Sequence, residues 1–332
     1  MVCLCGRTIF KNLLPLIDHS ANLSYQIWQQ YPANELYEDI AAYNTFGFML
    51  ASLCRLEARD SMTLLRSRFV GFLEDVILQN PAEADAANFL TSEGVLLKPD
   101  PARPHYHMAS PLVDGLIRNK LIPRLFPDSP SSTPPLQDEG EGLHVLNTLI
   151  ESLKFFDKTL IRLAAQNSYK KLKIKIPSVF NGQVPRESVY DTELLRILSN
   201  WLRNRYDWTV IGQWHLQNDM KKHKYSDIVI KKEENPSIVL ELLATGDTGS
   251  VKSHIQRTPE YMALLSATEA WVVHFTCEQN YHPVWQSDVE LSAGVNVVHF
   301  AHDLEFKKVV MSMRWKDHAG NVHQEDKQSL II

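Results

Sequence analysis

The feature that most constrains this chain is a change of hydrophobic pattern at about residue 188. Beyond that point, stretches with helical apolar spacing alternate with short apolar runs that suit buried strands. The expected helices span residues 188–206 and 249–265, the second broken at Pro259, and the expected strands span residues 208–216, 225–230, 237–244, 270–276 and 295–300. The first six elements follow the order α-β-β-β-α-β. This order predicts an α/β domain of two or three layers.

The rest of the chain divides into a helical region and a connection. Residues 1–127 predict a mainly α-helical region, because apolar residues recur there at mixed i+3 and i+4 spacing. Residues 128–142, within PDSPSSTPPLQDEGEG, hold proline, serine and acids with almost nothing to bury, so they predict a flexible linker. Residues 143–332 then form the second domain, which begins with a helix over residues 143–166.

Length and composition limit the class of protein. The 332 residues suit about two domains, and 44% hydrophobic with 22% charged residues is typical of a globular protein. The four cysteines, Cys3, Cys5, Cys54 and Cys277, are too scattered for a disulfide framework or a Cys-rich zinc site, and they indicate an intracellular, reducing compartment. No apolar run is long enough to predict a membrane span, and residues 1–10 show no classical signal peptide.

Three acidic residues stand where the apolar pattern does not favour a charge. On the first helix of the second pattern, Glu193 lies three residues after Tyr190 and four before Ile197, so it projects from the face that packs on the sheet. Asp227 begins the apolar run DIVI, and Glu241 interrupts the run SIVLELLA. Because a buried carboxylate without a partner is costly, all three acids require partners.

One divalent cation would satisfy these acids together. Mg²⁺ prefers oxygen ligands and keeps several waters, and a bound metal activates water and stabilises charge on a phosphodiester. We therefore expect Mg²⁺ or Mn²⁺ at Asp227 and Glu241, with Glu193 supporting that metal or a second ion. The alternative is structural, since a single acid commonly lies at a strand end in solvent or pairs with a base such as Arg196.

Local charge favours a nucleic-acid partner, although the net charge of -5 gives no hint of one. Between residues 168 and 232 there are about thirteen Lys and Arg against about six Asp and Glu, and a phosphate backbone is attracted to such an excess. The basic clusters are KKLKIK at residues 170–175, Lys221, Lys222 and Lys224 in KKHK, and Lys231 with Lys232. A set of solvated basic loops is an equally good interpretation of the clusters alone.

Two stretches of the chain resemble a known family. The run YSDIVIKKEENPSIVLELLATGDTGSVKSHIQRTPEYMALLSATEAWVVHF and the later VNVVHFAHDLEF resemble the C-terminal nuclease-like domain of Crinkler-type effectors of fungi and oomycetes. The segment HMASPLVDGLIRNKLIPRLFP resembles the region that links the NTPase and nuclease-like modules of those proteins. The resemblance covers about residues 100–315, and its motifs are distinctive in combination and weak singly.

The resemblance implies a restriction-endonuclease-like fold of the PD-(D/E)xK class, with Glu193, Asp227 and Glu241 at the metal positions. It also implies an effector that acts on DNA inside another organism's cells, often in the host nucleus after secretion. Members usually carry a secretion header and a P-loop NTPase, and this sequence shows neither. Residues 1–127 are then interpreted as a remnant of the NTPase module.

One departure from the class motif bears on activity. The motif is E-x-K, whose lysine helps to position or activate the attacking water, but here the triplet is Glu241-Leu242-Leu243. We expect Lys252, on the next helix, to supply the charge, and His254 and Gln256 on the same helix to contact the scissile phosphate. Otherwise Lys252 is a plain solvated lysine. If nothing replaces the missing lysine, the domain binds DNA without cutting it.

A second motif points to a different function. Residues 246–253 read GDTGSVKS, which matches a P-loop except that Val251 replaces the second glycine. A β-branched residue resists the close wrapping of the backbone around phosphates that the glycine permits. Nucleotide binding is therefore a minor alternative, which would need Lys252 and Ser253.

Two further groups of residues have a plain structural interpretation. His274 and His299 each lie in a V-V-H-F strand and are expected to be core histidines with satisfied nitrogens rather than metal ligands. Six tryptophans are mostly core by their spacing, and a non-catalytic interaction module that uses some of them is a third hypothesis with no partner named. They are Trp201, Trp208, Trp214, Trp271, Trp285 and Trp315.

Overall fold

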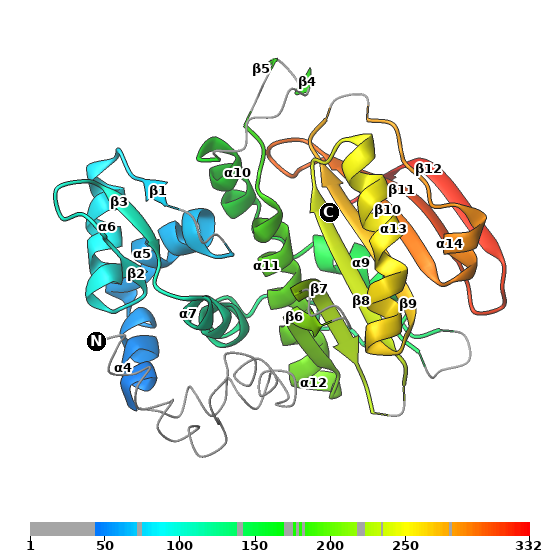
Figure 1. Ribbon diagram of the computed structural model, residues 1–332, viewed down its shortest axis with the longest axis horizontal. Helices are drawn as coiled ribbons and strands as arrows, with labels where there is room; N and C mark the ends of the chain where they lie inside the picture. Colours follow the sequence, from blue (N-terminus) through cyan, green and yellow to red (C-terminus); the bar gives the residue numbers. More distant parts are fainter. Residues whose placement is uncertain are drawn as a thin grey trace. The chain divides into compact units, whose positions relative to one another are not determined.

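The computed structural model divides the chain into two compact units, Met1–Leu125 and Phe126–Ile332 (Figure 1). The structure describes residues 44–71, 75–137, 142–168, 175–176, 179–180, 183–217, 223–233, 235–278 and 281–332. Each unit is treated by itself. Among the described residues, no helix is long and apolar enough to cross a membrane.

The described part of the first unit is mainly helical, as the sequence predicts. Its helical segments are α4 Asn44–Leu53, η2 Leu56–Ala58, α5 Arg59–Leu64, η3 Leu65–Phe69, α6 Pro81–Ser92, α7 Pro111–Leu116, η4 Ile117–Leu121 and α8 Ile122–Leu125. A small antiparallel sheet that the sequence did not predict joins them, in the order β1 Val76–Ile77, β3 His105–Met108 and β2 Leu96–Leu97.

The helix expected over residues 143–166 is two helices, α9 Val145–Leu153 and α10 Lys158–Gln166. The break occurs because the Asp157 side chain caps α10 and accepts the backbone N–H of Leu160 at 3.0 Å. Apolar residues on both sides of the break, including Leu149 and Leu160, still enter one core. Because the apolar residues of α9 and α10 continue one helical spacing, the sequence alone predicts a single helix here.

A seven-stranded mixed sheet forms the centre of the second unit, in the order β12-β11-β10-β9-β8-β7-β6. The strands are β6 Thr209–Gln217, β7 His223–Lys231, β8 Ser237–Ala244, β9 Ala267–Thr276, β10 Val295–His302, β11 Val309–Lys316 and β12 Val322–Leu330. Strand β9 is parallel to both β8 and β10, and the other neighbours are antiparallel. Strands β11 and β12 were not predicted, and a separate short hairpin pairs β4 Lys175–Ile176 with β5 Val179–Phe180.

The predicted order α-β-β-β-α-β is confirmed by α11, β6, β7, β8, α13 and β9. Helix α11 Glu187–Leu198 continues through the π-helical segment η5 Ser199–Arg203 into α12 Asn204–Tyr206. The short helix α14 Asp288–Ser292 precedes β10. The expected break at Pro259 is absent, because α13 Thr248–Leu265 carries Pro259 inside it. Residues on both sides of the proline, Ile255 and Met262, pack into the same core and hold the helix together.

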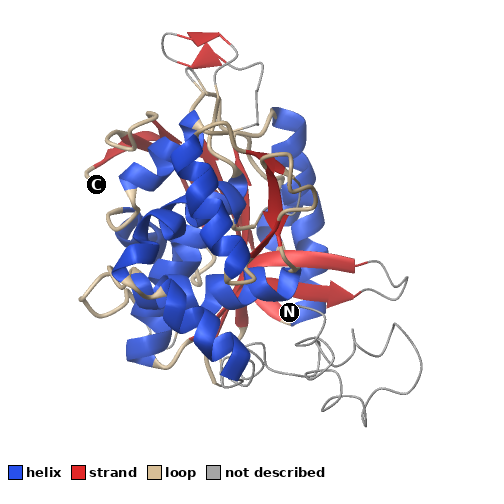
Figure 2. Ribbon diagram, turned by 90° about the vertical axis from the view of Figure 1, so that its left-hand side faces the viewer, coloured by secondary structure: helices blue, strands red, loops and turns tan. Residues whose placement is uncertain are grey.

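Helices α11 and α13 both pack on this sheet, and Figure 2 shows strands in red and helices in blue. Leu240 and Leu242 of β8 enter the core that α9, α10 and α11 share, whereas Val239 and Leu243 enter the core beneath α13. Side chains alternate between the faces of a strand, so Glu241 belongs to the α13 face. The structure is therefore a three-layer arrangement over this part of the sheet.

The segment that composition marked as a flexible linker, residues 128–142, lies against the second unit over its described part. Main-chain carbonyls of alternate residues accept hydrogen bonds from side chains of the α11–α12 region: Phe126 and Asp128 from Arg196, Pro130 from Arg205, and Ser132 from Trp201. We call residues 126–132 the strap. Its residues belong to no helix or strand, so donors on the helices satisfy these main-chain carbonyls.

The edge of the sheet formed by β12 differs from the buried central strands in its exposure and charge. Strand β12 is exposed along nearly its whole length, and its centre carries Glu325, Asp326 and Lys327. Its register with β11 shifts between Met311 and Met313, which marks a β-bulge, and Lys327 has a left-handed φ of 59°.

Helix α11 approaches β6 closely at Gly212, and this approach generates a stability prediction. A Cβ atom at Gly212 would lie 2.5 Å from Leu195 Cδ2, in the packed core between helix and strand. We expect Gly212→Ala to lower the free energy of unfolding by about 1–3 kcal/mol, because overpacking forces the helix or the rotamer to shift. Urea denaturation measures this change, and Gly249→Ala, where the nearest atom is 3.5 Å away, is the control.

Candidate functional site: a carboxylate pair between strands β7 and β8

Asp227 and Glu241 lie on adjacent central strands, next to the end of the backbone pairing of those strands. The backbone pairing of β7 with β8 runs from Ile230↔Ile238 to Ile228↔Leu240. Beyond it, Asp227 Oδ2 accepts the backbone N–H of Leu242 at 2.7 Å, so a side chain replaces the next ladder bond. Asp227 is 9% exposed and Glu241 0% exposed. Two acids are thus buried at neighbouring positions, as the sequence led us to expect.

The acid that helix α11 brings to this pair is Asp191. The amide nitrogen Nε2 of Gln213 donates to Asp191 Oδ2 at 3.2 Å and to Asp227 Oδ1 at 3.3 Å, so it bridges the two carboxylates. Burial raises the pKa of Asp227 well above its usual range, and the negative charges of Glu241, Asp191 and Glu187 raise it further. The N-terminal turns of α11 therefore contribute charge to the site.

Gln213 reaches both carboxylates from a strained backbone. It lies within β6 between the recorded pairs Gly212↔Ile228 and Trp214↔Ser226, yet its φ is 55°. A non-glycine residue in the left-handed region costs about 1–3 kcal/mol, and such strain persists where the surroundings impose it, often at functional sites. The unusual backbone and the bridging amide occur at the same residue, which singles out this part of the sheet.

Glu241 is only half satisfied. Its Oε2 accepts from Arg257 Nη2 at 3.0 Å, whereas its buried Oε1 meets no described donor in hydrogen-bond geometry; the Ser226 hydroxyl and the Asp227 N–H lie near this carboxylate and lower its pKa. Burial raises the pKa of Glu241 to about 7, and the Arg257 guanidinium opposes that rise. A buried carboxylate oxygen that lacks a donor is costly, so Oε1 is a natural ligand atom for a cation.

Arg257 stands at the solvent side of this carboxylate, on helix α13. Its side chain is 37% exposed, its Nη2 lies 2.9 Å from His254 Nδ1, and its guanidinium lies 5.6 Å from the centre of the Tyr261 ring. Burial and the Arg257 charge lower the pKa of His254 to about 4, so this imidazole is neutral and accepts the hydrogen bond. Arg257 was not among the site residues expected from the sequence.

The other site residues expected from the sequence make no direct described contact with Asp227 or Glu241. Lys252 and Gln256 are exposed on α13, and no contact among the described residues joins either to Asp227 or Glu241. His254 reaches the pair through Arg257. Lys221 and Lys222 lie outside the described residues, and Lys224 is described only by its backbone pairing with Leu216. The predicted phosphate contacts of these lysines stay predictions.

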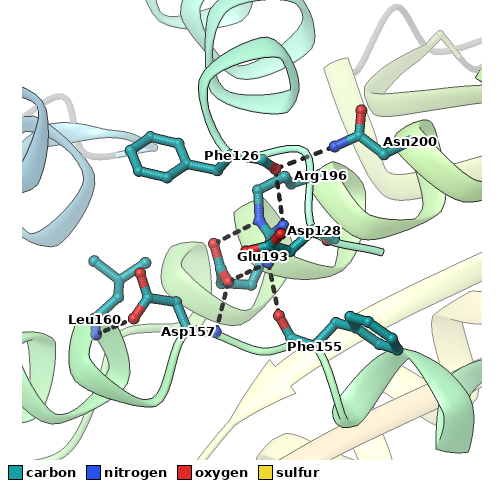
Figure 3. Close-up of polar contacts among 8 residues, drawn as sticks. All are labelled: Phe126, Asp128, Phe155, Asp157, Leu160, Glu193, Arg196 and Asn200. Atoms are coloured by element: carbon teal, nitrogen blue, oxygen red, sulfur yellow. Dashed lines mark hydrogen bonds and ion pairs between the residues drawn. The ribbon is translucent and has the colours of Figure 1, made fainter. Parts of the chain in front are cut away.

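Glu193 serves a different cluster (Figure 3). Its Oε1 accepts from Arg196 Nε at 3.2 Å, and its Oε2 accepts from Arg196 Nη2 and from the Asp157 backbone N–H, both at 2.9 Å. The same guanidinium donates to the carbonyls of Phe126, Asp128 and Phe155. Glu193 thus ties α11 to the strap and to the α9–α10 connection, and its expected support of a metal stays a prediction.

The donor set suits a small hard cation held by few protein ligands. Among the described residues, no group of three or more His, Cys, Asp or Glu side chains is arranged to hold a metal. Mg²⁺ does not need such a group, because it binds through one or two carboxylates and completes its shell with water and substrate phosphate. Asp227 and Glu241, with the unpartnered Oε1, are the residues that would hold it.

The P-loop interpretation finds no support in this geometry. The N–H of Ser250 donates to Asp247 Oδ1 at 2.7 Å, and the N–H of Gly246 donates to His274 Nε2 at 3.1 Å. Val251 is completely buried in the core beneath α13. A phosphate-binding loop presents its backbone N–H groups to the ligand, and here the cap of α13 engages them.

His274 and His299 are core histidines, as predicted. Since the Gly246 N–H donates to Nε2 of His274, the proton of that ring is on Nδ1. Nδ1 lies 3.1 Å from His299 Nδ1, which lies 2.8 Å from the Tyr281 hydroxyl, and His299 Nε2 lies 2.9 Å from the carbonyl oxygen and 3.3 Å from the nitrogen of Val284. A protonated Nδ1 has no lone pair for a metal. Trp201, Trp208 and Trp271 are likewise buried in the core.

Comparisons with known proteins return nothing for this chain. No protein family matches it, and neither does any curated protein or solved structure. Inference about function therefore depends on the residues and their geometry, together with the resemblance to Crinkler-type effectors.

The Glu193–Arg196 pair generates a stability prediction. Glu193→Gln leaves the Arg196 guanidinium buried without its counter-charge, and breaking a buried pair in this way costs about 3–5 kcal/mol. We expect urea denaturation to record a loss of that size. The matched control is Glu151→Gln, which breaks an exposed pair with Lys154 and should change stability by less than about 0.5 kcal/mol. Equal small losses in the two variants would contradict a structural role for Glu193.

The pKa of Glu241 generates a prediction about pH. An ordinary glutamate has a pKa of 4.5, and burial raises that of Glu241 to about 7. Between these values the folded protein keeps a proton that the unfolded chain has released, so the free energy of unfolding falls as pH rises, by roughly 3 kcal/mol over the window. Asp227, whose pKa is also raised, adds a slope of the same sign. We expect Glu241→Gln to flatten the dependence when urea denaturation is measured from about pH 4 to 8, and an unchanged slope would argue against a buried titrating carboxyl.

Proposed function

We propose that residues 143–332 form a metal-dependent nuclease domain that hydrolyses DNA phosphodiester bonds, with Asp227 and Glu241 holding Mg²⁺ or Mn²⁺. One observation carries the proposal: two buried carboxylates on adjacent central strands, linked through Gln213 to a third acid on α11 and provided with one unpartnered oxygen. A globular protein rarely keeps such a cluster without a cation or a function.

The arrangement of elements supports a restriction-endonuclease-like fold of the PD-(D/E)xK class. The order α11-β6-β7-β8-α13-β9, with β7 antiparallel to β8 and β8 parallel to β9, agrees with what the resemblance to Crinkler-type effectors implies. DNA as the substrate and action inside another organism's cells, in the nucleus, come from that resemblance. The basic segments near residues 170–175 and 221–224 favour a phosphate-bearing partner.

The chain's own residues would prepare the reaction. A bound divalent cation supplies activation of a water molecule and neutralisation of charge on the phosphate. Asp227 is held for this task by the Leu242 N–H and the Gln213 amide, which fix both of its oxygens. Glu241 turns one oxygen toward Arg257 and keeps the other for the metal. Asp191 orients the Gln213 amide from α11.

A second candidate function is DNA binding without cleavage. Leu243 occupies the position of the E-x-K lysine, and its side chain is 6% exposed within the core beneath α13. No lysine therefore enters the site from β8. This observation favours a pseudonuclease, in which the carboxylates hold a cation that helps to bind the phosphate backbone.

The experiment that tests the proposal is plasmid cleavage with Mg²⁺ or Mn²⁺. We expect the full chain to nick or cut, and we expect Asp227→Asn and Glu241→Gln to lose at least about a hundredfold in rate, since each removes a ligand charge. Both substitutions keep the shape of the side chain, and Glu151→Gln on the exposed face of α9 is the control. Absence of cutting by the wild type, with DNA binding retained in a gel shift, would favour the pseudonuclease.

A further inference from the structure

Arg257 makes the two carboxylate oxygens of Glu241 unequal, because it contacts only one of them. Its Nη2 holds Oε2 at 3.0 Å, and Oε1, on the same buried carboxylate, meets no described donor in hydrogen-bond geometry. A carboxylate that is free to rotate would exchange its two oxygens, whereas one that is held by a guanidinium at one oxygen presents the other in a fixed direction. The ion pair thus sets the orientation of Glu241.

Arg257 is itself held on its outer side. Its Nη2 also meets His254 Nδ1 at 2.9 Å, and its guanidinium lies over the Tyr261 ring. These residues lie one turn before and one turn after it on α13, so helical spacing brings all three together. His254, one of the expected phosphate contacts, acts on Glu241 through this arginine. The guanidinium is oriented from two sides before it reaches the carboxylate.

A positive charge is needed at this position for a second reason. Glu241, Asp191 and Glu187 add negative charge around Asp227, and Leu243 brings no cation from β8. Arg257 is the basic side chain that the described contacts place on the pair. It therefore offsets part of the repulsion between Asp227 and Glu241.

We propose that Arg257 is the positioning residue of the metal site: its guanidinium holds Glu241 Oε2 so that Oε1 faces the cation that Asp227 shares. This inference deepens the proposed nuclease function and depends on Asp227 and Glu241 holding a metal. It differs from a purely structural ion pair, which would change stability alone. It also differs from a gate, in which the guanidinium and the metal compete for the same oxygen.

The test measures Mn²⁺ binding to the full chain by calorimetry and by the Mn²⁺ EPR signal. We expect Arg257→Gln to weaken Mn²⁺ binding by about 10–100-fold, as loss of a group that orients a ligand does, and Arg257→Lys to recover part of the affinity. The matched control is Arg162→Gln, an exposed arginine on α10, which should bind Mn²⁺ like the wild type. Unchanged affinity in Arg257→Gln overturns the proposal in favour of a structural pair, and tighter binding overturns it in favour of competition.

A second measurement needs no variant. Phenylglyoxal modification of Arg257 in the wild type, followed by mass spectrometry, reports whether the guanidinium stays on Glu241. We expect saturating Mg²⁺ to leave the reactivity of Arg257 toward phenylglyoxal unchanged or lower, and a rise in reactivity would overturn the proposal.

If neither the wild type nor the variants bind Mn²⁺, the proposed metal site is wrong and this inference is wrong with it. A third outcome separates the two proposals. If Arg257→Gln binds Mn²⁺ more weakly but the wild type cuts no DNA, the positioning role of Arg257 is supported and only the proposed DNA cleavage is rejected.

Discussion

The buried ion pair between Glu193 and Arg196 is the interaction on which the arrangement of helix α11 depends. One guanidinium donates to a carboxylate on its own helix and to three main-chain carbonyls, two in the strap and one in the α9–α10 connection. A charged group removed from water is tolerated only when such bonds replace its hydration. The helix is thereby fixed in rotation, and that rotation decides which of its acids faces strand β6.

The earlier and later turns of α11 consequently contribute to two different polar clusters. Its first turns carry Glu187 and Asp191 toward Asp227, and its later turns carry Glu193 and Arg196 into the structural cluster. Successive residues on a helix differ in direction by about 100°, so two acids two residues apart reach opposite sides. The polar cluster around Arg196 and the carboxylate pair are therefore joined by one rigid element.

The order from α11 to β9 is readable in the sequence from its periodicity, and the pair Asp227 and Glu241 is readable because an acid inside an apolar strand is conspicuous. Glu193 was correctly expected to be buried, and its partner is Arg196, which the sequence offered as the structural alternative to a metal. Asp191 lies four residues after Glu187 and resembles an ordinary polar helix face. Arg257 is sixteen residues from Glu241, and no local pattern connects them. Such pairings arise from strand and helix packing, which periodicity does not specify.

The free edge formed by β12 has a consequence for how this protein behaves at high concentration. An edge strand presents unpaired backbone groups that recruit strands of other molecules and begin aggregation. Here the centre of that edge carries three charged residues, Glu325, Asp326 and Lys327, and the bulge between Met311 and Met313 interrupts its regular pairing. Both features discourage the addition of a strand from another molecule at this edge.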